Sequence, residues 1–378
     1  MVEKEEHKLL RETVRDFAEK ELESIAAHID EKDEFPQEVF RKLGGLGLLG
    51  ITASEEYGGG DAGFLSATIA MEELGRVSAS FALSYLAHTI LCVNGISENG
   101  NAEQKKKYLH DLIAGKKIGA MAMTEPGAGS DAVGMKTKAV KKGEYYYLNG
   151  EKAFITNGAI ADVMVVYART SADRDKGISA FIVEKDFSGF SVGKKLNKMG
   201  MRGSPTTSLI FKDCQVPAKN LMRKEGEGLS AMMQTLDVER ITISGISLGI
   251  AQAALEKSLE YAKVRKQFDQ PIIDFEMIQK KLADMATELE AARRFSYYAA
   301  ELADTNRKNL GFEASACKLF AAEMATRAGM DAIQIFGGYG YTKEYPVERY
   351  ARDAKLMEIG AGTSEIMRMK IVRELLKK

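Results

Sequence analysis

The chain has 378 residues, of which 45% are hydrophobic and 28% are charged, and its formal net charge at pH 7 is −1. This composition is typical of a globular protein with two or three domains and argues against a disordered or fibrous chain. The 53 basic and 54 acidic residues are spread along the sequence, so nothing indicates a nucleic-acid-binding surface.

The first third of the sequence has the periodicity of helices. Residues 3–27 place apolar side chains on one stripe with charges around it, which predicts an amphipathic helix. Phe35-Pro36 breaks the chain, and a second helix carries Val39, Leu43 and Leu46. Residues 57–63 are too rich in glycine for regular structure. Residues 65–97 are apolar on all sides, which predicts a helical segment buried inside a bundle, and a further helix covers residues 102–113.

The periodicity changes from 3.6 to 2 at about residue 115. Short β-rich runs then alternate with Gly, Asp and Ser, and Asn149-Gly150 predicts a hairpin turn because tight turns need positive φ. Beyond residue 226 the pattern is helical again. We therefore expect an N-terminal helical domain (residues 1–115), a middle antiparallel β-domain (116–225) and a C-terminal helical bundle (226–378), an α+β fold.

The cysteines, the histidines and the N-terminus bear on the class of protein. The three cysteines and four histidines are scattered without metal-ligand spacing, so we expect buried free thiols and no metal site. No apolar run comes near the roughly 18 residues of a membrane span. The N-terminal sequence MVEKEEHKLLRETV is charged and has no signal-peptide core. We expect an unprocessed bacterial cytoplasmic protein without membrane or nucleic-acid partners, and a mature mitochondrial matrix protein is the alternative.

The loop Thr124–Asp131 (TEPGAGSD) directly follows a strand-like run of small and apolar residues, 118–123. It combines two glycines, two hydroxyls and two carboxylates. Glycine permits close backbone approach, so such a loop can turn N–H groups and hydroxyls toward a polar ligand. The loop by itself equally fits an ordinary turn at the end of a strand.

Several motifs together resemble the signatures of the acyl-CoA dehydrogenase family. They are TEPGAGSD (124–131), FITNG (154–158), RKQF (265–268), FGGYGY (336–341) and RDAKLMEIGAGTSEI (352–366). They occur in the family's order and spacing over essentially the whole chain. GAGTSE and the segment LDVER (236–240) are most similar to the isovaleryl-CoA dehydrogenase branch. The resemblance implies an acyl-CoA dehydrogenase-like fold with a β-barrel-like middle domain, bound FAD, a homotetramer, and electron-transfer flavoprotein as the acceptor of electrons.

The implied reaction is desaturation of an acyl-CoA thioester to the 2-enoyl-CoA. A base removes the α-proton while flavin N5 takes the β-hydrogen as hydride, and a carboxylate in a dry pocket suits the base because desolvation raises its pKa. In much of the family the base directly precedes the Gly-Thr of the C-terminal motif, where this chain has Ala361. The isovaleryl-type branch instead carries it at the position of Glu239, which we predict to be the base. A solvated helix acid beside Arg240 is the alternative.

The resemblance also implies how the thioester is held. The backbone N–H of Ala361 would stabilise the developing enolate. Gly360, which replaces a bulky aromatic residue of other branches, would leave room for a branch at Cβ, although a glycine also eases a loop bend. The substrate-binding positions implied in this way are Ser130, Asp237, Arg240, Gly360, Ala361 and Gly362.

The flavin contacts follow from the same resemblance. Thr156 would hydrogen-bond near N5, and Phe154 would lie against the ring in place of the more common tryptophan. A second group would hold adenine and pyrophosphate across a subunit interface, where Arg265 supplies a planar phosphate fork, with a surface ion pair as its alternative. The predicted cofactor-binding residues are Met123, Thr124, Ser130, Phe154, Thr156, Arg265, Phe268, Gln334, Gly337, Gly338, Thr363 and Glu365.

Residues 84–91 limit the choice of substrate. Leu86 stands where the isovaleryl pattern has glycine, Ile90 stands where it has a polar residue, and no arginine indicates a dicarboxylic acyl chain. We favour a short, branched acyl-CoA such as isovaleryl-CoA, and a cyclic or longer acyl-CoA stays open. An acyl-CoA oxidase is disfavoured because the chain ends soon after the C-terminal bundle, and a non-catalytic acyl-CoA-binding scaffold is disfavoured by Glu239.

Overall fold

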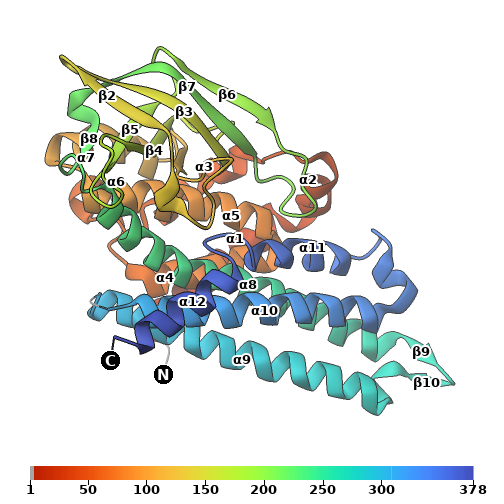
Figure 1. The fold of residues 1–378 in the computed structure, drawn as a ribbon. Coiled ribbons are helices and arrows are strands. Elements are labelled where there is room, and N and C mark those ends of the chain that lie inside the picture. The colour runs from red at the N-terminus through yellow and green to blue at the C-terminus, as the bar shows by residue number, and fades with distance from the viewer. Residues whose placement is uncertain (1–3, 308, 378) are drawn as a thin grey trace.

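The computed structural model describes residues 4–307 and 309–377. Helices from both ends of the chain form the lower part of the molecule in Figure 1, and the β-sheet lies above them. The predicted order of helices, sheet and helices along the chain is confirmed. The N-terminal helices are α1 (Glu5–Glu21), α2 (Ala26–Lys32), α3 (Gln37–Gly45), α4 (Gly63–Val77), α5 (Ala79–Leu86), α6 (Gly95–Asn99) and α7 (Ala102–Ile113). The C-terminal helices are α8 (Gly228–Val264), α9 (Glu276–Thr305), α10 (Gly311–Phe336), α11 (Val347–Met357) and α12 (Ser364–Leu375).

The predicted apolar segment is a stack of buried helical pieces. Ser78 separates α4 from α5, and its hydroxyl caps α5 by accepting a hydrogen bond from Phe81 N. α5 continues through a π-helical stretch, η4 (Ala87–Asn94), into α6. Contrary to the sequence expectation, the stretch Ala79–Asn99 is long and apolar enough to cross a membrane. Its most apolar window is entirely buried inside the fold, as in the core helix of a globular domain.

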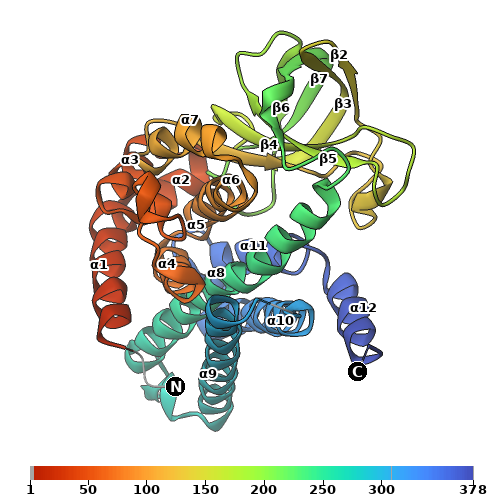
Figure 2. The ribbon, with the colours of Figure 1, turned by 90° about the vertical axis from the view of Figure 1, so that its left-hand side faces the viewer.

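The long helix α8 joins the N-terminal helices to the C-terminal ones. α4 crosses it so closely that a Cβ on Gly249 would lie 2.3 Å from Glu72 O, and one on Gly245 would lie 2.4 Å from Thr68 O (Figure 2). The absence of side chains at these two positions lets the helix backbones touch. A single cluster of buried apolar residues consequently extends through the N-terminal and C-terminal helices alike.

The middle segment forms an eight-stranded sheet with a separate apolar core. The strands are β1 (Gly119–Ala122), β2 (Lys138–Lys142), β3 (Tyr145–Thr156), β4 (Val163–Arg169), β5 (Ile178–Glu184), β6 (Phe190–Lys195), β7 (Thr206–Pro217) and β8 (Leu221–Met222). Their order is β6-β7-β3-β2-β4-β5-β8, with β1 beside β4. The pairing is antiparallel except that β4 runs parallel to β1 and to one residue of β2.

The hairpin predicted at Asn149-Gly150 was wrong. These residues lie inside β3, which forms the turn with β2 earlier, around Gly143. The Asn149 amide exchanges two hydrogen bonds of 2.9 Å with Asp213 of β7, and the strand register shifts there. The positive φ that favours Asn-Gly therefore serves a β-bulge instead of a chain reversal.

Candidate functional site

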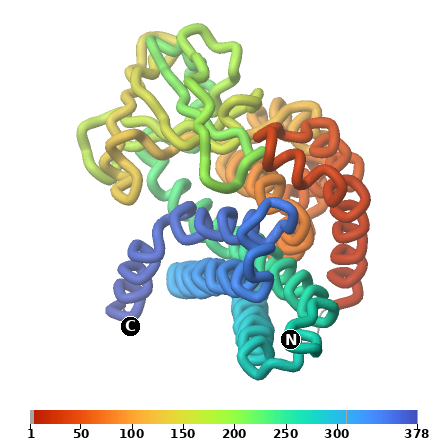
Figure 3. The backbone as a smooth tube through the Cα atoms, turned by 90° about the vertical axis from the view of Figure 1, so that its right-hand side faces the viewer, coloured from red at the N-terminus to blue at the C-terminus, as the bar shows by residue number. Residues whose placement is uncertain are grey.

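A cavity of about 1380 Å³ opens between the sheet and the helices. The loop after β1, the end of β3, α5, α8 and the loop between α11 and α12 line it. It brings together eleven of the predicted site residues: Met123, Thr124, Ser130, Phe154, Thr156, Glu239, Arg240, Gly360, Ala361, Gly362 and Thr363. Figure 3 shows the C-terminal segment, in blue, lying below the strands of the sheet.

Glu239 lies in the first half of α8 and is 6% exposed. Its Oε2 atom has no hydrogen-bond partner among the described residues. Burial raises the pKa of this carboxyl group to about 7, although the charges of Arg240 and Lys318 oppose the rise. A carboxylate in this state can take up a proton near neutral pH, which the alternative of a solvated helix acid would not do.

The loop Gly360–Gly362 faces the same cavity and has unusual backbone geometry. Ala361 has φ 55° and Gly362 has φ 98°, both in the left-handed region. Arg240 Nε donates to the Ala361 carbonyl at 3.1 Å, while Arg240 Nη1 donates to Asp237 Oδ1 at 2.8 Å. Asp237 also accepts from Lys370 Nζ at 2.9 Å. Arg240 and Lys370 line the cavity, whereas Asp237 does not. The loop carbonyl is thus fixed to α8.

A buried ion pair between Lys152 and Glu125 stabilises the glycine-rich loop after β1. Lys152 Nζ donates to Glu125 Oε1 and to Met123 O, each at 2.9 Å, and the Lys152 side chain is completely buried. Glu125 also accepts from the backbone N–H groups of Lys136 at 2.6 Å and Thr137 at 2.9 Å. Burial lowers the pKa of Lys152 to about 8. The Glu125 carboxylate of the TEPGAGSD motif therefore holds the loop to the residues that follow it and to β3.

The end of β3 presents an aromatic ring beside this loop. Phe154 is 66% exposed and has φ 57°, a conformation that is strained for a non-glycine residue. Ala153 N donates to Thr124 O at 2.8 Å, which ties the strand to the loop. An exposed ring next to Thr156 and to the hydroxyls of the loop fits a flat cofactor with polar edges, so these residues fit a flavin.

The α5 side of the cavity is apolar. Leu83, Leu86, Ala87 and Leu91 line it together with Ile243 of α8. Ile90 is buried but does not line the cavity, so only Leu86 of the two departures in this segment can touch an acyl chain. Six basic side chains also line the cavity: Arg174, Lys198, Lys355, Lys370, Arg373 and Lys377. An apolar wall together with these cations suits an acyl chain that carries phosphates.

The remaining predicted cofactor residues lie elsewhere. Arg265, Gly337 and Gly338 line a second cavity of about 530 Å³, in which the Arg265 guanidinium lies 5.7 Å from the centre of the Tyr339 ring. Phe268 is 88% exposed near it. Gln334, near the end of α10, is exposed and lines neither cavity. Glu365 is exposed in the first turn of α12, outside both cavities; Thr363, which lines the main cavity, caps that helix.

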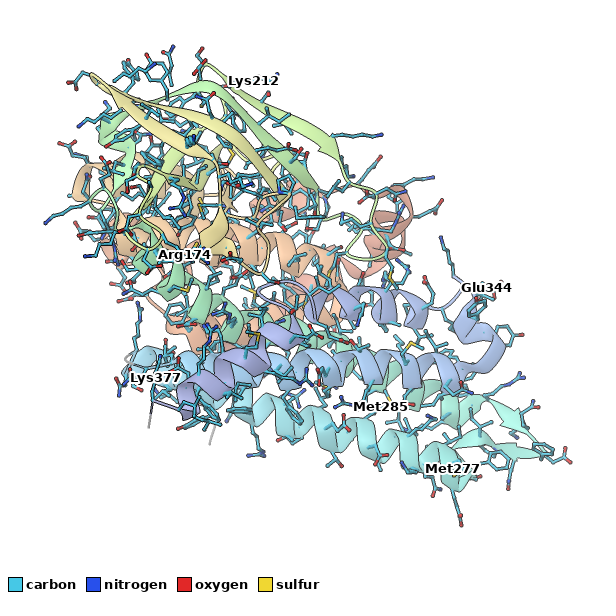
Figure 4. All side chains as sticks on the ribbon, in the orientation of Figure 1. Arg174, Lys212, Met277, Met285, Glu344 and Lys377 are labelled. Atoms are coloured by element: carbon cyan, nitrogen blue, oxygen red, sulfur yellow. The ribbon has the colours of Figure 1, made fainter. Side chains whose placement is uncertain are left out.

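The two cavities are far apart in one chain. From Glu239 to the end of α8 the helix spans 25 residues, or about 37 Å at 1.5 Å per residue. Figure 4 shows Arg174 of the main cavity under the sheet, while Glu344 of the second cavity lies at the far end of the helices. The chain therefore divides the predicted cofactor residues between two separate places.

Sequence reasoning missed three groups at the main cavity. Lys318 of α10 donates to the Gly362 carbonyl at 2.6 Å, and the Glu125–Lys152 pair supports the loop. A lone lysine in the apolar sequence of α10 was the available signal for Lys318. The three cysteines are buried and free as predicted. Within residues 4–307 and 309–377, no group of three or more His, Cys, Asp and Glu side chains is arranged to hold a metal.

Comparisons with known proteins cover nearly the whole chain. Residues 4–116, 120–214 and 226–376 match the models of the acyl-CoA dehydrogenase N-terminal, middle and C-terminal domains. The chain is 48% identical over 374 residues to the mitochondrial isovaleryl-CoA dehydrogenase of Pongo abelii, covering 98% of this chain and 88% of that protein.

Two solved structures are also similar. Butyryl-CoA dehydrogenase from Megasphaera elsdenii is 41% identical with a TM-score of 0.97, covering 100% of this chain and 99% of that one. A chain from the study of the electron transferring flavoprotein of Acidaminococcus fermentans is 43% identical with a TM-score of 0.97, and 99% of each chain is covered.

Proposed function

Because the chain belongs to the acyl-CoA dehydrogenase family of FAD-dependent oxidoreductases, we propose that it desaturates a short, branched acyl-CoA between Cα and Cβ with Glu239 as the base. The observation that carries this proposal is the buried Glu239 carboxyl, with its unpartnered oxygen, in the cavity that Ala361 also lines. Family membership gives the reaction class. The assignment of the base and the preference for a branched chain are ours.

Glu239 removes the α-proton of the bound thioester. Burial keeps water from competing for the carboxylate and gives it a proton affinity suited to neutral pH. The electron pair of the broken C–H bond moves to the thioester oxygen. The Ala361 N–H stabilises the charge that develops there, because a preorganised donor in a dry site is worth about 3–4 kcal/mol. Arg240 fixes the adjacent Ala361 carbonyl and so limits the rotation of the loop.

FAD would be held in the main cavity by Met123, Thr124, Ser130, Phe154 and Thr156. When bound, it supplies the acceptor for the β-hydrogen. The residues of the second cavity, with Arg265 and the Gly337-Gly338 pair, would serve the cofactor of a neighbouring subunit, since about 37 Å of helix separates them from Glu239. This separation supports an assembly in which a neighbouring subunit completes the cofactor site; the homotetramer that we propose is one such assembly.

The preference for a branched acyl chain rests on two residues of the cavity. A Cβ on Gly360 would meet no atom closer than 3.5 Å, so the space beside this residue is open. Leu86 lines the apolar α5 side of the cavity, and we propose that its side chain limits the length of the acyl chain. The lining residues on the α5 side are Leu83, Leu86, Ala87 and Leu91. This side therefore offers no cation to bind a second carboxylate of the substrate. A cyclic or longer acyl-CoA stays the alternative.

Three further proposals concern the whole protein. Electron-transfer flavoprotein accepts the electrons, in keeping with the similarity to a chain from a study of that partner. The protein acts in the cytoplasm of a bacterium, although its relatives include a mitochondrial enzyme. The chain is divided into domains at residues 1–115, 116–225 and 226–378.

Anaerobic bleaching of the flavin absorbance tests the reaction and the base together. We expect isovaleryl-CoA to bleach wild type faster than butyryl-CoA, a long-chain acyl-CoA or glutaryl-CoA, and Glu239→Gln to abolish bleaching. Glu260→Gln on the exposed part of α8 is the matched control and should behave as wild type. Bleaching that persists in Glu239→Gln would place the base elsewhere. Steady oxygen consumption with acyl-CoA would indicate an oxidase instead.

A further inference from the structure

Lys318 is an unusually placed lysine. It lies on α10 among apolar neighbours and is 1% exposed. Its ammonium group donates to the Gly362 carbonyl at 2.6 Å, so its hydrogen-bond partner is a backbone oxygen and not a carboxylate. Burying a lysine charge is costly unless other groups compensate it. A lysine retained in such a position calls for a role beyond packing.

Glu239 is the carboxylate that most favours the charged form of Lys318, ahead of Glu358 and Glu323. The positive charge of Lys318 favours the ionised form of Glu239, and Glu239 in turn favours the charged form of Lys318. Burial is the largest influence on both groups and opposes both charges, which brings the pKa of Lys318 down to about 8. Three other charged groups act on this pair, namely Arg240, Glu323 and Glu358, and Glu239 in turn raises the pKa of Tyr167.

Lys318 and Arg240 hold two successive carbonyls of one loop. Arg240 Nε, from α8, donates to Ala361 O at 3.1 Å, and Lys318 Nζ, from α10, donates to Gly362 O at 2.6 Å. Both loop residues have positive φ, and Ala361 pays a steric penalty for it as a non-glycine residue. Two cations on two different helices therefore fix the backbone on the C-terminal side of the Ala361 N–H.

We propose that Lys318 is a positioning residue for this reaction: it fixes the loop that carries the Ala361 N–H and keeps Glu239 in the ionised form that can accept a proton. The inference rests on the proposed function, in which Glu239 is the base. In the step concerned, the α-C–H bond breaks and its proton moves to Glu239. The electron pair passes to the thioester oxygen, and Lys318 keeps all its protons.

Deuterium uptake from D₂O into acetyl-CoA isolates this step. Acetyl-CoA has α-hydrogens but no β-carbon, so exchange at its methyl group reports proton removal without dehydrogenation. With the purified FAD-loaded enzyme, we expect the wild-type exchange rate to rise with pH to a plateau above about pH 7, because Glu239 must be ionised. In Lys318→Met the lost cation raises the pKa of Glu239, so this rise should move to higher pH by one unit or more.

The plateau should also fall in Lys318→Met, by roughly tenfold, because the charge-assisted hydrogen bond that holds the loop is lost. Lys318→Arg keeps the charge and should keep the wild-type pH dependence. Lys257→Met removes an exposed lysine of α8 and should change neither quantity. If Lys318→Met does not fold, Lys318→Gln keeps a donor without a charge and should show the same shift in pH.

The outcomes separate this inference from the proposed function. A Lys318→Met or Lys318→Gln enzyme with the wild-type pH dependence and plateau overturns the role of Lys318 and leaves Glu239 as the base. Absence of exchange in the wild type, together with absence of bleaching by every acyl-CoA, overturns the proposed function. A lower plateau without any shift in pH dependence contradicts the electrostatic part of the proposal.

Discussion

The buried pair Glu125–Lys152 offers a direct test of how the glycine-rich loop is built. Lys152→Met keeps most of the side-chain volume but removes the donor to Glu125 Oε1 and to Met123 O. Glu125 then keeps only the backbone N–H groups of Lys136 and Thr137. Removing one partner of a buried ion pair costs about 3–5 kcal/mol, because the other charge stays buried without compensation.

This penalty falls on the loop that we expect to contact the flavin. If about 3 kcal/mol of it disfavours the binding-competent loop conformation, the apparent affinity for FAD falls by roughly 100-fold. Fluorescence titration of the apoprotein with FAD measures this change, and urea unfolding of the same apoprotein measures the loss of stability. Both readouts are independent of catalytic activity.

Two variants serve as controls for Lys152→Met. Lys185→Met breaks an exposed ion pair with Asp162 in the same sheet and should cost less than about 1 kcal/mol. The double variant Glu125→Gln/Lys152→Met removes both charges and should recover part of the FAD affinity. Wild-type FAD affinity and stability in Lys152→Met would refute the reasoning that this pair holds the loop.

Three further predictions concern stability. The pKa of Glu239 is raised from 4.5 to about 7, so the folded state loses stability progressively as the pH rises between these two values. Glu239→Gln should therefore be more stable than wild type at pH 8, by roughly 3 kcal/mol at most. In thermal melts this gain should vanish below pH 4.5. Gly249→Ala should lower the free energy of urea unfolding by about 1–3 kcal/mol or more, because the added Cβ would lie 2.3 Å from Glu72 O. In the control Gly45→Ala the added Cβ would meet no atom within 4 Å, so this variant should be neutral or slightly stabilising. Asp304→Ala should lower the free energy of unfolding by about 1 kcal/mol, because the Asp304 carboxylate accepts from Phe64 N and Leu65 N at the start of α4. An equally low melting temperature for Asp304→Asn, which keeps an acceptor, would contradict this capping role.

The features that followed from the sequence are those set by local pattern. The change from helical to alternating periodicity predicted where the sheet begins. The motif resemblance predicted that Glu239 and Ala361 share one site although 122 positions separate them, and both line the same cavity. Local pattern failed where a distant partner decided the outcome. Asn149-Gly150 has the composition of a tight turn, but Asp213 of β7 binds the Asn149 amide and keeps the chain extended.

Side-chain direction in the acyl region could not be predicted from helical spacing. Residues 87–94 form a π-helical stretch with wider turns than an α-helix, so the faces shift relative to a regular 3.6-residue repeat. Leu86, just before this stretch, lines the cavity, whereas Ile90 within it is buried without lining the cavity. Of the two departures from the isovaleryl pattern in this segment, only Leu86 therefore bears on the choice of substrate.

In the proposed reaction, the two chemical tasks fall to different segments of the cavity lining. The proton acceptor would be Glu239 of α8, while the donor for the thioester oxygen would be the backbone N–H of Ala361, which does not depend on the side chain at that position. Arg240, the next residue on α8, binds the Ala361 carbonyl, so the helix that carries the base also sets the position of the loop. A carboxylate on α8 therefore keeps a fixed relation to the loop N–H, and alanine at position 361 is compatible with catalysis.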